Sequence, residues 1–311
     1  MISFENEVES SRDLIGANTG LLLARERREV FSLHPEIRFL AWAGAMLIAA
    51  AAATFIANNR ERIGPLVIAI VIGLAAAVCY AFAWWRRRSR DSSHIDDSSL
   101  VDDYVLLLGA LLLSADVGFI ESQFHLFEDS WTRHFLILAL VHAITAYRFD
   151  SRMVLTLSIA ALAAWFGIEE RDLVFSSSGT AADLFAAAVA VLAWTLLDRR
   201  FRPSRTFDRT FEHFIANLAL AGGVTLVFDP ETIYGGVALT LVLVALVIAW
   251  GLRTQAEPFV LYAIVYGVVA VDSLVFDLVR DEPLRLLFAI VSVIAALVLL
   301  FLAHARFRRL A

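Results

Sequence analysis

Residues 284–304 read LRLLFAIVSVIAALVLLFLAH, and the ionisable side chains of this stretch, Arg285 and His304, lie at or next to its two ends. An α-helix rises 1.5 Å per residue, so about 20 apolar residues cover the roughly 30 Å hydrocarbon core of a bilayer. Nine further stretches share this character, and hydrophobic residues make up 59% of the 311-residue chain, whereas soluble domains hold about 45–50%. The sequence therefore predicts an all-α fold, a polytopic integral membrane helix bundle with about ten transmembrane helices.

The expected spans fill most of the chain between residues 37 and 304. They are residues 37–58, 65–85, 103–122, 134–148, 152–168, 182–198, 210–228, 232–251, 258–276 and 284–304. The fourth and fifth spans are short and could instead form a single re-entrant pair. Arg148, Asp150 and Arg152 lie between them, and because charges are costly in hydrocarbon, these residues indicate a turn at a water interface.

The distribution of arginine predicts the orientation of the chain. There are 26 basic residues, all of them arginine. If the N-terminus is placed in the cytoplasm, 20 of them fall in inner segments and 6 in outer loops. This split agrees with the excess of positive charge found on the cytoplasmic side of membrane proteins. With an even number of spans, we expect both termini to be cytoplasmic.

Residues 1–36 differ in composition from the rest of the chain. They are polar and mixed in charge, and residues 21–34 can form a short helix that ends before Pro35. They lack the short basic region and apolar core of a cleavable signal peptide, so we expect the first span to act as the insertion signal. The sequence predicts a cytosolic N-terminal helical segment over residues 1–36 and a transmembrane bundle over residues 37–311.

The third span has one face that differs from its lipid-like surroundings. Polar and small residues recur along it every seven positions, and residues at this spacing lie within about 20° of one another on a helix. They are Asp102, Gly109, Asp116 and Gln123. We therefore expect this face to look inward, toward protein or water.

Asp116 is the most informative single residue, because it lies about two-thirds of the way across the third span. An ionisable group at that depth is a functional candidate that needs a partner. We name His142, on the next and antiparallel span, as that partner. The two groups could share a proton that titrates near neutrality. Alternatively, they form a buried polar pair that only holds two helices together.

Four further polar residues complete the candidate intramembrane site. They are Gln123 in the third span, His213 and Asn217 in the seventh, and Asp272 in the ninth. Hydrogen bonding between helices is the plain alternative for each of them. Glu121 and His134 lie near the outer ends of their spans, and we expect water to solvate both.

The sequence contains none of four common motifs of catalysis and of metal or nucleotide binding. The chain has no H-E-x-x-H, G-x-S-x-G, G-x-x-x-x-G-K-[ST] or G-x-G-x-x-G sequence, motifs typical of zinc proteases, serine hydrolases and nucleotide-binding loops. Cys79 is the single cysteine, so no intrachain disulfide can form. We expect no catalytic residue, no metal site, no cofactor and no nucleic-acid partner, and an enzymatic activity is disfavoured.

Residues 38–59, RFLAWAGAMLIAAAAATFIANN, and residues 104–126, YVLLLGALLLSADVGFIESQFHL, resemble a family of bacterial multi-pass membrane proteins grouped under a domain of unknown function. Asn58, Asn59 and Gln123 match positions of the family pattern, whereas Arg60 stands where the family often has Trp. The resemblance covers roughly residues 20–170. It implies a location in the bacterial inner membrane and brings no activity with it.

Two functions fit these features. A carrier-like or permease-like protein for a small solute, or for protons, would use the acidic and histidine residues at depth. Ten spans also divide into five and five at residues 169–181, and inverted halves are the layout of many secondary transporters, although the two halves share no visible sequence identity. The alternative is a non-transporting scaffold or sensor whose N-terminal helix engages a cytosolic protein. Lipid surrounds the chain in both cases.

Overall fold

The computed structural model describes residues 64–89, 99–126, 133–167, 178–202 and 207–310, together with Leu47 and Thr54. Within these residues the chain is helical and contains no strand. The helices are α5 (Pro65–Ser89), α6 (Ser99–Phe124), α7 (Arg133–Phe149), α8 (Arg152–Gly167), α9 (Ser178–Phe201), α10 (Asp208–Val227), α11 (Ile233–Arg253), α12 (Glu257–Leu278) and α13 (Glu282–Leu310). The expected segment 1–36 and nearly all of the expected span 37–58 lie outside the described residues.

Each expected span from residues 65–85 onward coincides with one of these helices. Seven of the described helices are long and apolar enough to cross a membrane: α5, α6, α9, α10, α11, α12 and α13. The other two, α7 and α8, have 17 and 16 residues and are shorter than the roughly 20 residues of a full span. The predicted class, an all-helical polytopic membrane protein, is confirmed.

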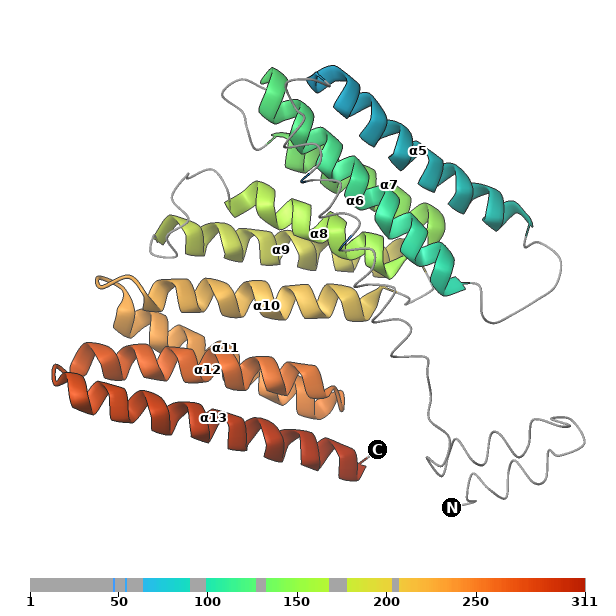
Figure 1. The fold of residues 1–311 in the computed structure, drawn as a ribbon. Coiled ribbons are helices and arrows are strands. Elements are labelled where there is room, and N and C mark those ends of the chain that lie inside the picture. The colour runs from blue at the N-terminus through green and yellow to red at the C-terminus, as the bar shows by residue number, and fades with distance from the viewer. Residues whose placement is uncertain are drawn as a thin grey trace, which may run out of the picture. The chain divides into compact units, whose positions relative to one another are not determined.

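The chain divides into two compact units, residues 1–68 and 69–311. In the first unit the structure describes Leu47, Thr54 and residues 64–68. In the second unit, every helix from α7 to α13 packs against the next one in the chain. Helix α6 packs against both α7 and α8, and α10 packs against α12 as well as against α9 and α11 (Figure 1).

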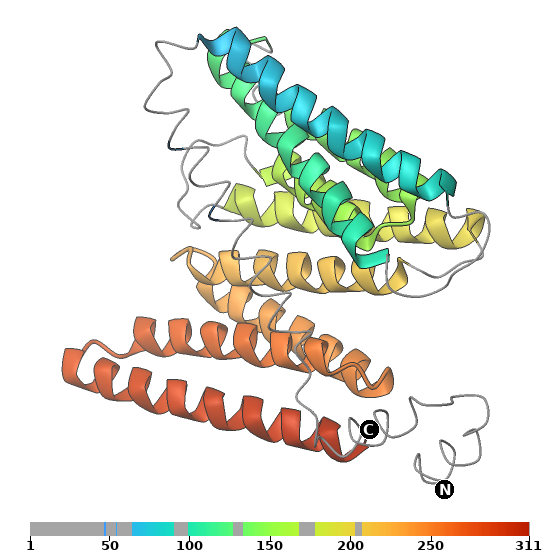
Figure 2. The same ribbon diagram turned by 45° about the vertical axis from the view of Figure 1, so that its right-hand side comes forward.

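The main core of the second unit lies where α5, α6, α7, α8, α9 and α10 meet (Figure 2). Small residues let the backbones approach closely, as membrane helix packing requires, and Ala110, Ala146 and Ala187 are fully buried there. Phe207 and Phe211 fill the remaining space at the start of α10 and are also fully buried. The core therefore ties α10 to the preceding helices rather than leaving α9 and α10 as a separate hairpin.

The turn between α7 and α8 lies level with the ends of longer helices. Asp150 adopts a positive φ of 57°, which reverses the chain, and its carboxylate pairs with Arg202 at the end of α9 at 2.8 Å. On the other side, Arg87 at the end of α5 donates a hydrogen bond to the carbonyl of Arg148. Because α5 and α9 are both full-length spans, their contacts favour two crossings by α7 and α8 over a re-entrant pair.

Helix α13 shows most plainly the apolar exterior of a membrane protein. Packed against α12, it keeps large apolar residues such as Leu286, Val293, Leu297 and Phe301 more than half exposed. Water would penalise such a surface, but lipid tails are as apolar as leucine. The exposed apolar face of α13 therefore suits hydrocarbon.

Candidate functional site

Asp116 lies on the face of α6 that packs against α5. Its side chain is 8% exposed, and Oδ1 has no hydrogen-bond partner among the described residues. Oδ2 lies against Gly73 of α5, so close that a Cβ added to Gly73 would be 2.9 Å from it. A carboxyl group is therefore enclosed in protein, within the length of a membrane-spanning helix, and none of the described residues donates a hydrogen bond to its Oδ1.

Glycine on each helix permits this close approach. A Cβ added to Gly109 would lie 3.0 Å from Cβ of Cys79. Gly109 and Asp116 are seven residues apart, so the contact between α5 and α6 runs along the face of α6 that the sequence predicts to look inward.

His142 lies on α7 and is 1% exposed. Its Nε2 is 2.8 Å from Oγ of Ser114 on α6, so the expected bond to Asp116 is not formed and Ser114 is the partner instead. The Ser114 hydroxyl is also 3.0 Å from the carbonyl of Ala110, to which it donates. A hydroxyl has one proton to give, so if it donates to Ala110, Nε2 of His142 carries the proton that it shares with Ser114. Nδ1 has no hydrogen-bond partner among the described residues.

Glu121 and His134 are both 3% exposed, which corrects the expectation that water solvates them. Glu121 lies on α6, about 7.5 Å beyond Asp116 along the helix axis at 1.5 Å per residue, and His134 lies in the first turn of α7. Both are near a helix end, but neighbouring side chains cover them. Buried titratable groups thus extend from the C-terminal end of α6 and the N-terminal end of α7 to the depth of Asp116.

The candidates on α10 lie in a different place, at the contact with α12. The ring of His213 stacks on Phe259 with a centroid distance of 4.8 Å. Asn217 donates to the carbonyl of His213 at 2.8 Å, and its Oδ1 is 3.5 Å from the hydroxyl of Tyr266. These contacts fit the plain alternative, in which polar side chains join two helices.

The two remaining candidates are also apart from Asp116. Asp272 accepts a 2.6 Å hydrogen bond from Ser292 of α13. Gln123, in the last turn of α6, is half-buried, with Nε2 3.4 Å from Oγ of Ser122. The structure therefore brings Asp116 and His142 onto adjoining helices and distributes the other candidates over two further helix contacts and one helix end.

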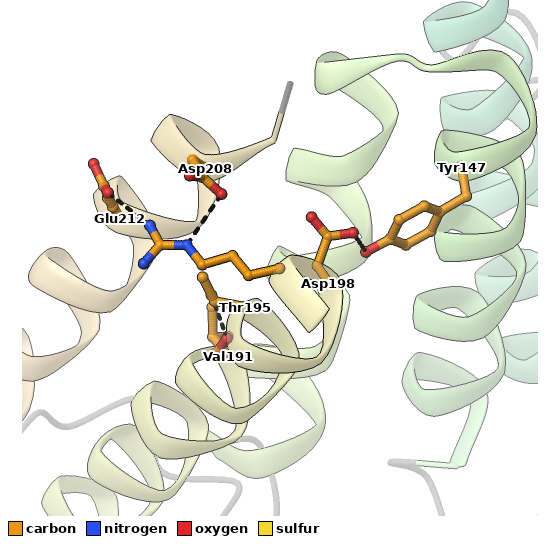
Figure 3. Close-up of polar contacts among 7 residues, drawn as sticks. Tyr147, Val191, Thr195, Asp198, Asp208 and Glu212 are labelled. Carbon is orange, nitrogen blue, oxygen red and sulfur yellow. Dashed lines mark hydrogen bonds and ion pairs between the residues drawn. The ribbon is translucent and has the colours of Figure 1, made fainter. Parts of the chain in front are cut away.

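A polar network at the opposite end of the helices was not predicted. Tyr147 of α7 donates a 2.8 Å hydrogen bond to Asp198 of α9, and the two side chains point toward each other in Figure 3. Trp194 donates to the same tyrosine oxygen at 2.9 Å. The guanidinium of Arg202 lies over the rings of Tyr147 and Phe207, with centroid distances of 5.4 and 4.9 Å. The carboxylate of Asp198 is thus buried with a donor, unlike that of Asp116.

The next residue along α9 points to α10. Arg199 contacts Asp208 at 3.3 Å and Glu212 at 3.1 Å, two carboxylates one helical turn apart on α10 (Figure 3). Consecutive residues thus connect α9 to α7 on one side and to α10 on the other. Neither this network nor any other group of three His, Cys, Asp or Glu within the described ranges is arranged to hold a metal ion.

The N-terminal part of the chain matches a known family. Residues 15–155 match the family described as Predicted membrane protein (DUF2157). This match confirms the resemblance to an uncharacterised family of multi-pass membrane proteins, and it includes Asp116 and His142 but ends before α9. Neither the comparison with curated proteins nor that with solved structures found a match. The family description supports a membrane protein and names no activity.

Ser114, Gly73 and the network around Tyr147 are the contacts that sequence reasoning missed. Tyr147 and Asp198 each lie at the end of an expected span, where a polar side chain needs no partner because water is near. Ser114 does stand in the sequence beside Asp116 and one helical turn beyond Ala110. Its pairing with His142 depends on how α6 is rotated about its axis, which the spacing of residues does not determine.

Proposed function

We propose that this membrane protein is a carrier that moves protons, alone or together with a small solute, and that Asp116 binds the proton. The single observation that supports this function is a carboxyl group enclosed within a spanning helix whose Oδ1 has no donor among the described residues. Ionisable residues within spans are rare and commonly belong to ion pathways and proton relays.

An ionised side chain in the interior of a membrane protein carries a high free-energy cost. A carboxylate without donors is far more costly in a dry interior than a neutral carboxylic acid. While the site is closed, Asp116 therefore holds a proton. The proton leaves when water or a partner reaches the carboxyl group, so its release is coupled to a change of access, which is the coupling that a proton-driven carrier needs.

The neighbouring buried groups support a route to this site. Glu121 lies between Asp116 and the outer end of α6, and His134 lies at the outer end of α7. His142 lies deeper than both, and its Nδ1 has no hydrogen-bond partner in the described part of the chain. In the proposed mechanism, Glu121 and His134 pass protons toward Asp116, and the Ser114–His142 pair lines the other side of α6. Gln123, His213, Asn217 and Asp272 are proposed as supporting polar groups.

The proposal includes the orientation and location of the chain. Both termini lie in the cytoplasm, the membrane is the bacterial inner membrane, and Glu121 and His134 face the outside. The distribution of arginine supports this orientation. It makes the Tyr147–Asp198 network the inner end of the bundle, where hydrogen bonds and ion pairs join α7, α9 and α10.

Proton movement can be measured without knowing the solute. Purified protein is reconstituted into liposomes that contain a pH-sensitive dye, and a negative-inside potential is applied, first alone and then with amino acids, sugars or monovalent cations outside. We expect wild-type protein to acidify the lumen under at least one condition, and Asp116→Asn to reduce the rate about a hundredfold or more, which is the lower end of the effect that positioned proton-transfer groups supply. Glu231→Gln, which changes an exposed acid in the α10–α11 turn, is the matched control.

Two results would contradict the carrier function. One is an Asp116→Asn rate equal to that of wild type under every condition. The other is wild-type liposomes that acidify no faster than protein-free liposomes. The second result would favour the alternative function, a scaffold or sensor that engages a cytosolic partner through residues 1–36.

A further inference from the structure

Two arginines on neighbouring helices form a cluster with two aromatic rings at the ends of α5 and α7. Arg148 of α7 lies over Trp84 of α5 at 4.4 Å from the ring centroid, and Arg87 of α5 lies over Phe149 of α7 at 5.7 Å. The two rings pack edge to face, with centroids 6.2 Å apart. Each helix thus contributes one guanidinium and one ring, and each guanidinium lies on the ring of the other helix.

This cluster has no carboxylate. Within the described parts of the chain, Arg87 and Arg148 form no ion pair, although both are exposed, and the hydrogen bond from Arg87 ends on the carbonyl of Arg148. Arginines at the end of α9 behave differently, because Arg199 and Arg202 contact carboxylates at 2.8 to 3.3 Å. The nearest carboxylate in sequence, that of Asp150, is taken by Arg202. Among the described residues, no carboxylate therefore compensates these two positive charges.

The contacts with the rings determine what these arginines can bind. A guanidinium held against a ring still presents the N–H groups that the ring does not contact, and those groups match the oxygen pairs of a phosphate. Two guanidinium groups held on neighbouring rings repel each other, and an anion that binds both relieves this repulsion. The chemistry of the cluster is therefore that of a phosphate-binding site.

The position of the cluster favours a lipid headgroup as the source of the phosphate. It lies at the ends of spanning helices, at the level where Trp84 marks the interface between headgroups and hydrocarbon. Farther into the membrane, Phe82 and Val78 of α5 and Ile144 of α7 are exposed apolar side chains that can contact acyl chains. We propose that Arg87 and Arg148, supported by Trp84 and Phe149, bind the headgroup phosphate of an anionic phospholipid.

Binding can be measured by native mass spectrometry of the purified full-length protein, titrated with phosphatidylglycerol or with phosphatidylcholine of the same acyl chains. We expect wild type to prefer phosphatidylglycerol, and Arg87→Gln/Arg148→Gln to weaken that binding roughly thirtyfold, since each arginine near an anionic headgroup contributes about a fivefold factor. Arg306→Gln/Arg308→Gln is the control. It removes the same charge from two exposed arginines of α13, and it should bind phosphatidylglycerol as wild type does.

Three outcomes would overturn the proposal. Wild type could bind both lipids equally, both double variants could lose affinity to the same extent, or inorganic phosphate at the lipid concentration could displace phosphatidylglycerol, which would make free phosphate the ligand. If Arg87→Gln/Arg148→Gln fails to fold, Arg148→Lys serves instead. It keeps the charge but loses the planar edge and the stacking, and we expect it to weaken phosphatidylglycerol binding several-fold. Wild-type affinity in this variant would equally overturn the proposal.

Discussion

Gly73 controls the space available to Asp116. A Cβ at this position would lie 2.9 Å from Oδ2 of Asp116, which is closer than van der Waals contact allows. We expect Gly73→Ala to push the carboxyl group aside and lower the free energy of unfolding in detergent, toward the lower end of the roughly 1–3 kcal/mol typical of overpacking, because the atom that must move is the tip of a side chain. Thermal unfolding of the purified variant would measure the loss.

A double variant and a matched glycine separate this contact from a general effect of alanine. In an Asp116→Ala background the added methyl group meets no carboxyl oxygen, so Gly73→Ala should cost less there, with a coupling of about 0.5 kcal/mol or more. Gly118→Ala on α6 has no heavy atom within 4 Å of the new Cβ and should be neutral or stabilising by up to about 1 kcal/mol. Equal losses for Gly73→Ala and Gly118→Ala would show that Gly73 does not confine Asp116.

Depth within a span was enough to single out Asp116 and His142, but not to pair them. Ser114 and Asp116 are two residues apart, so they point about 200° apart around the helix axis, and only one of them can face α7. Ser114 is the residue that faces α7 because of how α6 is rotated about its axis. That rotation follows from the packing of α6 against two other helices. For Glu121 and His134, closeness to a helix end suggested solvation, whereas the structure buries both, with 3% of each residue exposed.

The turn between α10 and α11 depends on one of two adjacent glycines. A Cβ at Gly236 would lie 2.6 to 2.8 Å from backbone atoms of Leu226 and Val227, whereas a Cβ at Gly235 would meet nothing within 4 Å. Backbone atoms cannot move aside as a side chain can, so we expect Gly236→Ala to destabilise the protein by about 3 kcal/mol or more. Gly235→Ala should be neutral or slightly stabilising. Similar melting temperatures for the two variants would contradict this packing of α10 against α11.

At the scale of elements, the apolar runs predicted the described helices well, and the differences have a physical cause. Helix α5 continues to Ser89, although the expected span ends at residue 85, and α13 continues to Leu310. Hydropathy marks only the part of a helix that lies in hydrocarbon. The backbone hydrogen-bond ladder continues into the polar interface, where Arg86 and Arg87 remain helical. The contacts of Asp150 and Arg148 that favour two crossings by α7 and α8 come from helices distant in sequence, so no local pattern could supply them.

For the whole molecule, the order of spans was predictable from the sequence, but the neighbours of each helix were not. Alternating apolar runs and short polar turns imply antiparallel contacts between consecutive helices, and α7 to α13 show them. Helices α10 and α12 are not consecutive in the chain, and their contact includes the stacking of His213 on Phe259. The spacing of residues in the sequence does not predict this contact. The side of the membrane on which each turn lies rests on the arginine distribution alone.

The claim that the chain crosses the membrane ten times, with α7 and α8 as full crossings and both termini inside, underlies the rest of the account. Single cysteines in a Cys79→Ala background, labelled in intact cells by an impermeant thiol reagent, test it most directly. The account predicts labelling at Ser177→Cys and Glu231→Cys, and none at Ser92→Cys or at Arg152→Cys in the α7–α8 turn until the membrane is opened. Labelling of Arg152→Cys in intact cells together with Ser177→Cys would contradict it.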